Sequence, residues 1–74
     1  MEAAQTGGVK RLVVNGVERE VAAVTLAAAL RALDYTDAVV ATALNGEFVP
    51  ARKRAETILS EGDRIEIVAP RQGG

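Results

Sequence analysis

The chain has 74 residues, enough for one small domain, and its 9 Lys and Arg residues nearly balance its 10 Asp and Glu residues. It contains no Cys and no His, which excludes disulfide bonds, zinc–thiolate sites and catalytic arrangements built on a thiol or an imidazole. The balanced charge and the single Tyr and Phe argue against nucleic-acid binding, and no apolar run is long enough to span a membrane. We therefore expect a soluble cytoplasmic protein that is not an enzyme, binds no metal, and has no nucleic-acid or membrane partner.

The first half of the sequence predicts a β-hairpin. Residues 1–8 show no periodic pattern and are expected to form a flexible N-terminal extension. Two β-prone runs, 10–14 and 17–21, then flank Asn15-Gly16, a dipeptide that is the strongest short-range signal for a hairpin turn.

The register of this hairpin has two possible forms. A two-residue turn pairs Val14 with Val17 and Leu12 with Arg19. Because an arginine then lies beside core positions, a bulge or a longer turn is an open alternative.

A helix is predicted after the hairpin. The hydroxyl of Thr25 is suited to cap the first turn by accepting a hydrogen bond from a backbone N–H group. Apolar residues then recur at helical spacing and form one face: Leu26, Ala29, Leu30 and Leu33. We expect the helix to end near Asp34-Tyr35 and to pack against a sheet rather than on a membrane or a partner.

Two further strands are predicted in the middle of the chain. Residues 38–44 are rich in Val and Ala, which favours a well-buried strand. A second hairpin signal, Asn45-Gly46, leads into a short strand at 47–49, which Pro50 ends.

The segment after this strand carries the only run of three cationic residues in the chain. Residues 51–55 are predicted to form a loop, and they include Arg52, Lys53 and Arg54. This cluster is interpreted either as a solvated loop or as a docking patch for an acidic partner. Ile58 and Leu59 are then expected to return to the core.

The last predicted strand spans residues 64–69. Residues 60–63 (Ser-Glu-Gly-Asp) are typical of a turn. In the strand itself, alternation places Ile65 and Ile67 inward and Arg64 and Glu66 outward.

The order of these elements predicts an α+β fold, in which a mixed sheet cups one main helix and carries a flexible C-terminal tail. The final strand is expected to lie centrally beside the first strand. We divide the chain into an N-terminal extension (1–8), a domain (9–69) and a reactive tail (70–74).

The tail has an unusual composition. Pro70 ends the strand, and Gly73 and Gly74 present only backbone and then a free carboxylate. Such a tail, about 17 Å long when extended, fits a narrow cleft of another protein, where chemistry is done on the carboxylate. The alternative interpretation is a frayed chain end without a function.

Taken together, several motifs resemble the ThiS family, the β-grasp sulfur carrier proteins of thiamin biosynthesis. The resemblance covers residues 10–74 and implies a ubiquitin-like β-grasp fold. It rests on the Val-Asn-Gly turn, the Thr25-Leu26 helix start, residues 43–50 (ALNGEFVP), residues 61–68 (EGDRIEIV) and the closing Gln72-Gly73-Gly74. One departure is Arg54, where the family often carries an aromatic residue.

The resemblance also implies a function for the tail. Gly74 would carry sulfur as a C-terminal thiocarboxylate after adenylation of its carboxylate, with Gly73 and Gln72 threading the cleft. An α-carboxyl group has an ordinary pKa of about 3.3–3.7, so it is ionised at neutral pH and needs activation. A ThiF-like adenylating enzyme would use ATP and Mg²⁺ for this step, so no cofactor is expected on this chain.

The same resemblance names the remaining partners. A sulfur donor such as a cysteine desulfurase would supply sulfur, and thiazole synthase (ThiG) would receive it. A molybdopterin-synthase small subunit or a carrier for cysteine or another sulfur-containing product shares the fold and the Gly-Gly end, and a plain β-grasp interaction domain is a further alternative.

We also expect a docking surface, because a short tail alone cannot hold two proteins in register. The candidates are the outward residues of the last strand and the charged loop: Arg64, Glu66, Val68, Arg52, Lys53 and Arg54.

Overall fold

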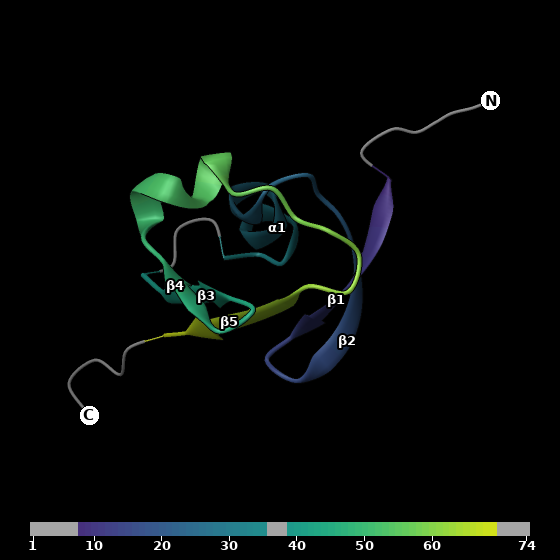
Figure 1. The fold of residues 1–74 in the computed structure, drawn as a ribbon, viewed down its shortest axis with the longest axis horizontal. Coiled ribbons are helices and arrows are strands. Elements are labelled where there is room, and N and C mark those ends of the chain that lie inside the picture. The colour runs from purple at the N-terminus through teal and green to yellow at the C-terminus, as the bar shows by residue number, and fades with distance from the viewer. Residues whose placement is uncertain (1–7, 36–38, 70–74) are drawn as a thin grey trace.

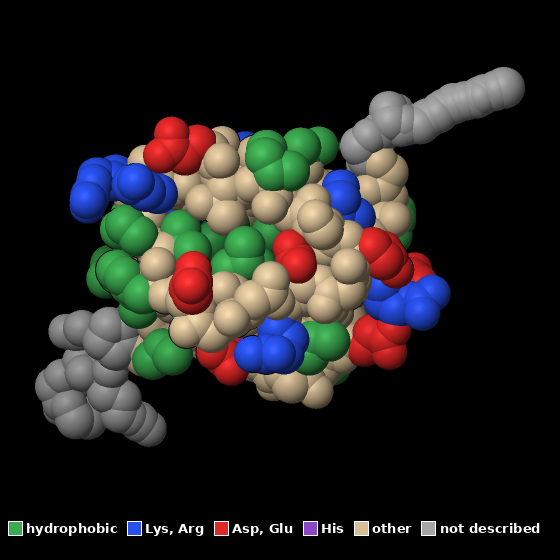
Figure 2. Space-filling view, viewed as in Figure 1, with side chains coloured by type: hydrophobic (Ala, Val, Ile, Leu, Met, Phe, Trp, Pro, Cys, Tyr) green, Lys and Arg blue, Asp and Glu red, His purple; other side chains and the backbone are tan. Residues whose placement is uncertain are grey.

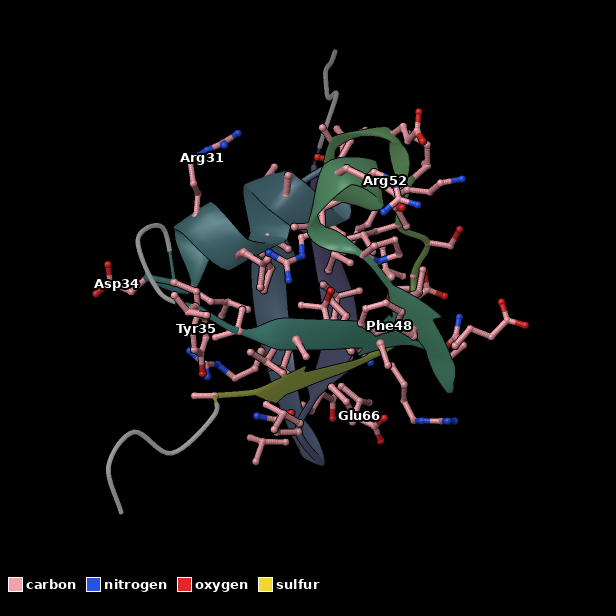
Figure 3. The ribbon with its side chains drawn as sticks, turned by 90° about the vertical axis from the view of Figure 1, so that its left-hand side faces the viewer. Arg31, Asp34, Tyr35, Phe48, Arg52 and Glu66 are labelled. Carbon is pink, nitrogen blue, oxygen red and sulfur yellow. The ribbon has the colours of Figure 1, made fainter. Side chains whose placement is uncertain are left out.

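A five-stranded mixed sheet in the order β2-β1-β5-β3-β4 forms the frame of the computed structural model, which describes residues 8–35 and 39–69 (Figure 1). The strands are β1 (Val9–Val14), β2 (Val17–Ala22), β3 (Ala41–Leu44), β4 (Glu47–Val49) and β5 (Arg64–Val68). Helix α1 (Leu26–Ala32) and the 3₁₀ helix η2 (Ala51–Glu56) lie together over one face of the sheet (Figures 1 and 3). The α+β architecture with one main helix is therefore confirmed, whereas the predicted tail (70–74) and the predicted extension (1–8) except Gly8 lie outside the described residues.

The β1–β2 hairpin has the simpler of the two predicted registers. Val14 lies opposite Val17, and Leu12 lies opposite Arg19. Asn15 and Gly16 have φ angles of 51° and 82°, and positive values at both positions are those of a type I′ turn. The arginine causes no conflict, because β2 is an edge strand in which only one residue is buried.

Helix α1 begins as predicted and ends earlier than predicted. The Thr25 hydroxyl accepts a hydrogen bond of 3.1 Å from the Ala28 N–H group. The helix stops at Ala32, before the expected Asp34-Tyr35, because the chain turns into the left-handed region at Asp34, where φ is 76°. The Tyr35 N–H group donates to the Leu30 carbonyl at 2.8 Å, which closes the helix in a Schellman motif.

The predictions for the middle strands are only partly correct. Strand β3 begins at Ala41, later than predicted, and among its residues only Thr42 is buried. The expectation of a well-buried strand was wrong, since the helices cover a single face of the sheet. Strand β4 has the predicted bounds, and Asn45 and Gly46 form its turn with φ angles of 52° and 88°.

The segment between β4 and β5 differs most from the prediction. Residues 51–56 form the 3₁₀ helix η2 instead of a loop. Leu59 is buried as predicted, but Ile58 is 62% exposed, so its assignment to the core was wrong. The reason is the extended backbone, in which neighbouring side chains point to opposite sides: Ile58 forms a bridge with Thr25, and Leu59 turns inward.

Strand β5 lies at the centre of the sheet, as predicted. It runs parallel to β1 on one side and antiparallel to β3 on the other. Ile65 and Ile67 point inward and are 1% and 6% exposed. They pack in a core with buried residues from β1 and β2, from α1, from β4 and from the segments that follow β2 and η2: Leu12, Val14, Val21, Ala23, Leu26, Ala29, Leu30, Val49 and Leu59.

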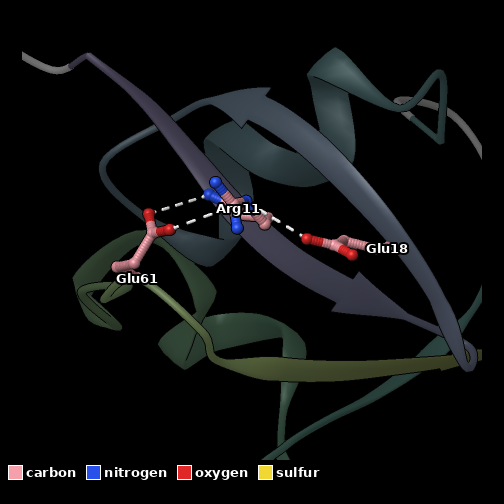
Figure 4. Close-up of polar contacts among 3 residues, drawn as sticks. All are labelled: Arg11, Glu18 and Glu61. Atoms are coloured by element: carbon pink, nitrogen blue, oxygen red, sulfur yellow. Dashed lines mark hydrogen bonds and ion pairs between the residues drawn. The ribbon is translucent and has the colours of Figure 1, made fainter.

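The turn before β5 is attached to β1 (Figure 4). The Arg11 N–H group donates to Glu61 Oε1 at 2.9 Å, and the Gly62 N–H group donates to the Arg11 carbonyl at 2.8 Å. Arg11 Nε also lies 3.1 Å from Glu18 Oε2, but both side chains are about 60% exposed, and such an ion pair contributes about 0–1 kcal/mol. The two hydrogen bonds made by the Arg11 backbone therefore fix the start of β5, whereas the ion pair with Glu18 joins β1 to β2.

Candidate functional site

Strand β5 is the structural base of the candidate site, because the tail follows it directly in the sequence. The tail residues proposed for threading and sulfur transfer, Gln72, Gly73 and Gly74, lie outside the described residues. The three outward residues of β5 are exposed as expected from the alternation: Arg64, Glu66 and Val68. In Figure 3, Glu66 points away from the helices. The outer face of β5 is thus the described part of the chain nearest in sequence to the tail.

The outer face also carries an apolar patch that the sequence analysis missed. Ala43 lies opposite Phe48 on one side and opposite Glu66 on the other, so these three side chains share a face. Two residues further along, on the same face, Ala41 lies opposite Val68. Phe48 is 69% exposed and Val68 is 62% exposed, so both large apolar side chains of this face are open to solvent.

We call these residues the β5 patch: Ala41, Ala43, Phe48, Glu66 and Val68. The space-filling view shows apolar side chains gathered on the left-hand part of the described surface (Figure 2). The signal for Phe48 was present in the sequence: the Asn45-Gly46 turn fixes the register of β3 against β4 and places Phe48 opposite Ala43.

The three cationic residues of the predicted docking loop do not act alike. Arg52 and Lys53 are exposed on η2. The guanidinium of Arg54 turns inward, where Nε donates to Thr42 Oγ1 at 3.1 Å and Nη2 donates to the Val40 carbonyl at 2.6 Å. Arg54 therefore joins η2 to β3 and to the residue before it, and Arg52 and Lys53 are the exposed cationic residues of η2.

A shallow hollow lies between α1 and η2, with a volume of about 220 Å³. Small and apolar residues line most of it, with Arg31, Tyr35 and Arg54 among them, and no carboxylate is among the described lining residues. The described lining thus has no pair of groups suited to general acid–base catalysis.

Within the described part of the chain, no three Asp or Glu side chains gather in a way that would hold a metal ion. None of the helices in that part is long and apolar enough to cross a membrane.

Comparison with known proteins decides the family. The model of the ThiS family matches residues 12–74, almost the whole domain and the entire tail. The chain belongs to the ThiS family. It is similar to the crystal structure of a thiamine biosynthesis protein (ThiS) from Geobacter metallireducens, with 29% sequence identity and a TM-score of 0.73. The match covers 86% of this chain and 99% of that chain, and no curated protein matches the sequence.

Membership in the ThiS family confirms the resemblance found in the sequence and, with it, the β-grasp fold. Proteins of this family are small sulfur carriers of thiamin biosynthesis and not catalysts themselves.

Proposed function

We propose that this protein carries sulfur for thiazole formation in thiamin biosynthesis, as a thiocarboxylate on the C-terminal glycine, Gly74. The observation that carries the proposal is the ThiS family match, which spans residues 12–74 and so includes Gly73 and Gly74. The absence of Cys supports it, because a thiocarboxylate lets the chain carry sulfur without a thiol side chain.

The chemistry requires two steps on the Gly74 carboxylate. In the first step, a carboxylate oxygen forms a bond to the α-phosphorus of ATP, the bond to the β-phosphate oxygen breaks, and pyrophosphate leaves. The product is an acyl-adenylate, a mixed anhydride with a good leaving group. In the second step, hydrosulfide forms a bond to the carbonyl carbon, and AMP leaves with the electron pair of the carbon–oxygen bond.

A separate adenylating enzyme of the ThiF type is proposed to supply ATP and Mg²⁺ for these steps. When a cysteine desulfurase replaces free sulfide, the donor is a persulfide, and a thiol reductant must cleave its sulfur–sulfur bond. Thiazole synthase is the proposed acceptor of the sulfur.

Intact mass spectrometry tests the proposal. The protein is incubated with ATP, Mg²⁺, the adenylating enzyme and sulfide, and the expected product differs by one oxygen replaced by one sulfur. Two variants serve as controls: one lacks Gly74, and one carries an additional residue after it. Both are expected to stay unloaded, since one residue moves the carboxylate by about 3.4 Å, and a misplacement of about 1 Å can cost about 10²-fold in rate. Full conversion of the shortened variant would refute the proposal.

We further propose that the β5 patch is the docking surface for the adenylating enzyme. Phe48 and Val68 are large, exposed and apolar, and aromatic side chains are typical anchors at protein interfaces. Replacing Phe48 by Ser is expected to raise the KM for the carrier at least about fivefold, because truncating an anchor at an interface costs more than about 1 kcal/mol.

Val17→Ser is the matched control for this substitution. Val17 is 58% exposed and lies opposite the inward residue Val14. It belongs to β2, at the edge of the sheet opposite β4, and is therefore away from the patch. Its KM is expected to equal that of the native protein. Equal KM values for the Phe48 variant and the native protein would remove the patch from the interface and leave the sulfur chemistry untouched.

A further inference from the structure

The side chain of Asn15 continues the sheet at the point where the backbone of β1 leaves it. The Asn15 N–H group donates to the Ile65 carbonyl at 2.9 Å. Beyond that bond, Asn15 Nδ2 donates to the Ile67 carbonyl at 3.1 Å, and the Ile67 N–H group donates to Asn15 Oδ1 at 2.7 Å. One turn residue therefore makes three hydrogen bonds to the backbone of β5.

These side-chain bonds replace the ones that a longer β1 would have made. The β1–β5 ladder consists of the pairs Val13 with Arg64 and Val14 with Ile65. In a continued parallel ladder, the carbonyl of residue 15 would accept from Ile67, and the N–H group of residue 17 would donate to Ile67. The chain turns at residues 15–16 into β2 instead, and the Asn15 amide supplies both the acceptor and the donor.

The bonded residue, Ile67, lies at the exit of the central strand. On its other side it pairs with Thr42 of β3, and Val68 after it is the last residue of β5. The N–H and C=O groups of a strand residue point to the same side, and those of Ile67 both point toward β1, so without Asn15 neither group would have a strand partner. With Asn15, β5 is held from both sides up to its last buried residue.

We infer that Asn15 is a positioning residue for the reaction at Gly74, which fixes the direction in which the chain leaves the sheet. The inference rests on the proposed function. A carboxylate that must reach a catalytic centre in another protein is sensitive to its placement, since about 1 Å can change the rate about 10²-fold. If the end of β5 is loosely held, the direction in which the chain leaves the sheet varies more. By bonding Ile67, Asn15 reduces this variation without contacting the reacting group.

The second hairpin provides a matched control at the opposite end of β5. Asn45 also occupies the first position of an Asn-Gly turn, with a φ angle of 52° against 51° for Asn15. Its Oδ1 accepts from the Arg64 N–H group at 2.9 Å, and its Nδ2 donates to Asp63 Oδ1 at 3.0 Å. The two asparagines thus make comparable bonds, but Asn45 binds the start of the strand and Asn15 binds its exit.

The test compares Asn15→Gly, Asn15→Asp and Asn45→Gly with the native protein. Glycine accepts a positive φ angle and so keeps either turn while removing the side-chain bonds. Aspartate keeps the acceptor for Ile67 and loses the donor. All proteins are assayed at a temperature where circular dichroism shows each of them folded, with pyrophosphate release by the adenylating enzyme as the rate. Amide hydrogen exchange at Ile67 is measured by NMR on the same samples.

Asn15→Gly is expected to lower kcat about tenfold with little change in KM, because docking is retained while placement of the carboxylate is lost. The Ile67 amide of the Asn15→Gly variant is expected to exchange faster than that of the native protein. Asn15→Asp should lower kcat less than Asn15→Gly does. The kcat of Asn45→Gly should stay within about twofold of the native value. A native kcat for Asn15→Gly, or an equal loss for Asn45→Gly, would overturn the positioning role alone. A native protein that is not adenylated at all would refute the proposed function and, with it, the role of Asn15 in that reaction.

Discussion

Removal of the Arg54 guanidinium should destabilise the domain, although the sequence places Arg54 in a charged surface cluster. The side chain donates to Thr42 Oγ1 and to the Val40 carbonyl, so Arg54→Ala breaks two hydrogen bonds between η2 and β3. Thr42 is 2% exposed, but its hydroxyl keeps the bond of 2.8 Å that it donates to the Val49 carbonyl. Water can reach the half-buried Val40 carbonyl and replace part of the second bond.

The expected loss of unfolding free energy is smaller than the summed contributions of two hydrogen bonds made by a charged group. Such bonds contribute about 1.5–3 kcal/mol each when they are fully buried, and we expect about 1–2 kcal/mol in total here. For a domain of this size, that loss lowers Tm by roughly 4–16 °C. Arg54→Lys should lose most of the same stability, since one ammonium group cannot reproduce the two-nitrogen geometry.

Thermal unfolding followed by circular dichroism measures the effect, with Arg52→Ala as the matched control on the same helix. Arg52 is exposed, and its replacement should change the free energy of unfolding by less than about 0.5 kcal/mol. Equal Tm values for Arg54→Ala and Arg52→Ala would refute the inward role of Arg54.

Two further predictions concern the residue that ends α1 and the exposed charges of η2. Asp34→Gly should raise Tm by roughly 2–8 °C in the same assay, because Asp34 has a φ angle of 76° and glycine relieves about 0.5–1 kcal/mol of strain there; a lowered Tm would contradict this. Reversing the charges of Arg52 and Lys53 together should slow association with an acidic partner and flatten its dependence on salt, as stopped-flow binding would show; an unchanged rate would leave η2 outside the interface.

The local signals of the sequence were sufficient to locate the two hairpin turns and the faces of β5. Each Asn-Gly pair set a two-residue turn, and the turn alone determined which residues face one another across the hairpin. Alternation then gave the inward and outward residues of β5, because a one-residue shift would have exposed both Ile65 and Ile67.

The predictions from the sequence were wrong where tertiary contacts determine which side chains face the core. Ile58 and Leu59 are adjacent and equally apolar, and only the bridge to Thr25 determines that Leu59 faces the core. The inward turn of Arg54 depends on Thr42 and Val40, which precede it by 12 and 14 residues. No periodic pattern in 51–56 distinguished a 3₁₀ helix from a loop.

The candidate site was predictable to a similar degree. The outward residues of β5 followed from alternation along one strand. Phe48 required the register of two hairpin strands and their place beside β5, so the apolar character of the patch emerged only from the sheet order.

The central place of β5 has a consequence for how a partner can use the tail. An edge strand such as β4 is bonded along one side only, and its end would move independently of the rest of the sheet. Strand β5 is bonded along both sides up to Ile67, so its exit moves with the whole domain. A partner that holds the outer face at Val68 would therefore find the Gly74 carboxylate within about 20 Å, the reach of residues 69–74 at roughly 3.3–3.6 Å each. If Gly74 is the reacting residue, as we propose, a change of one residue in the length of the tail would displace its carboxylate by about 3.4 Å, and movement of the strand could not compensate for this displacement.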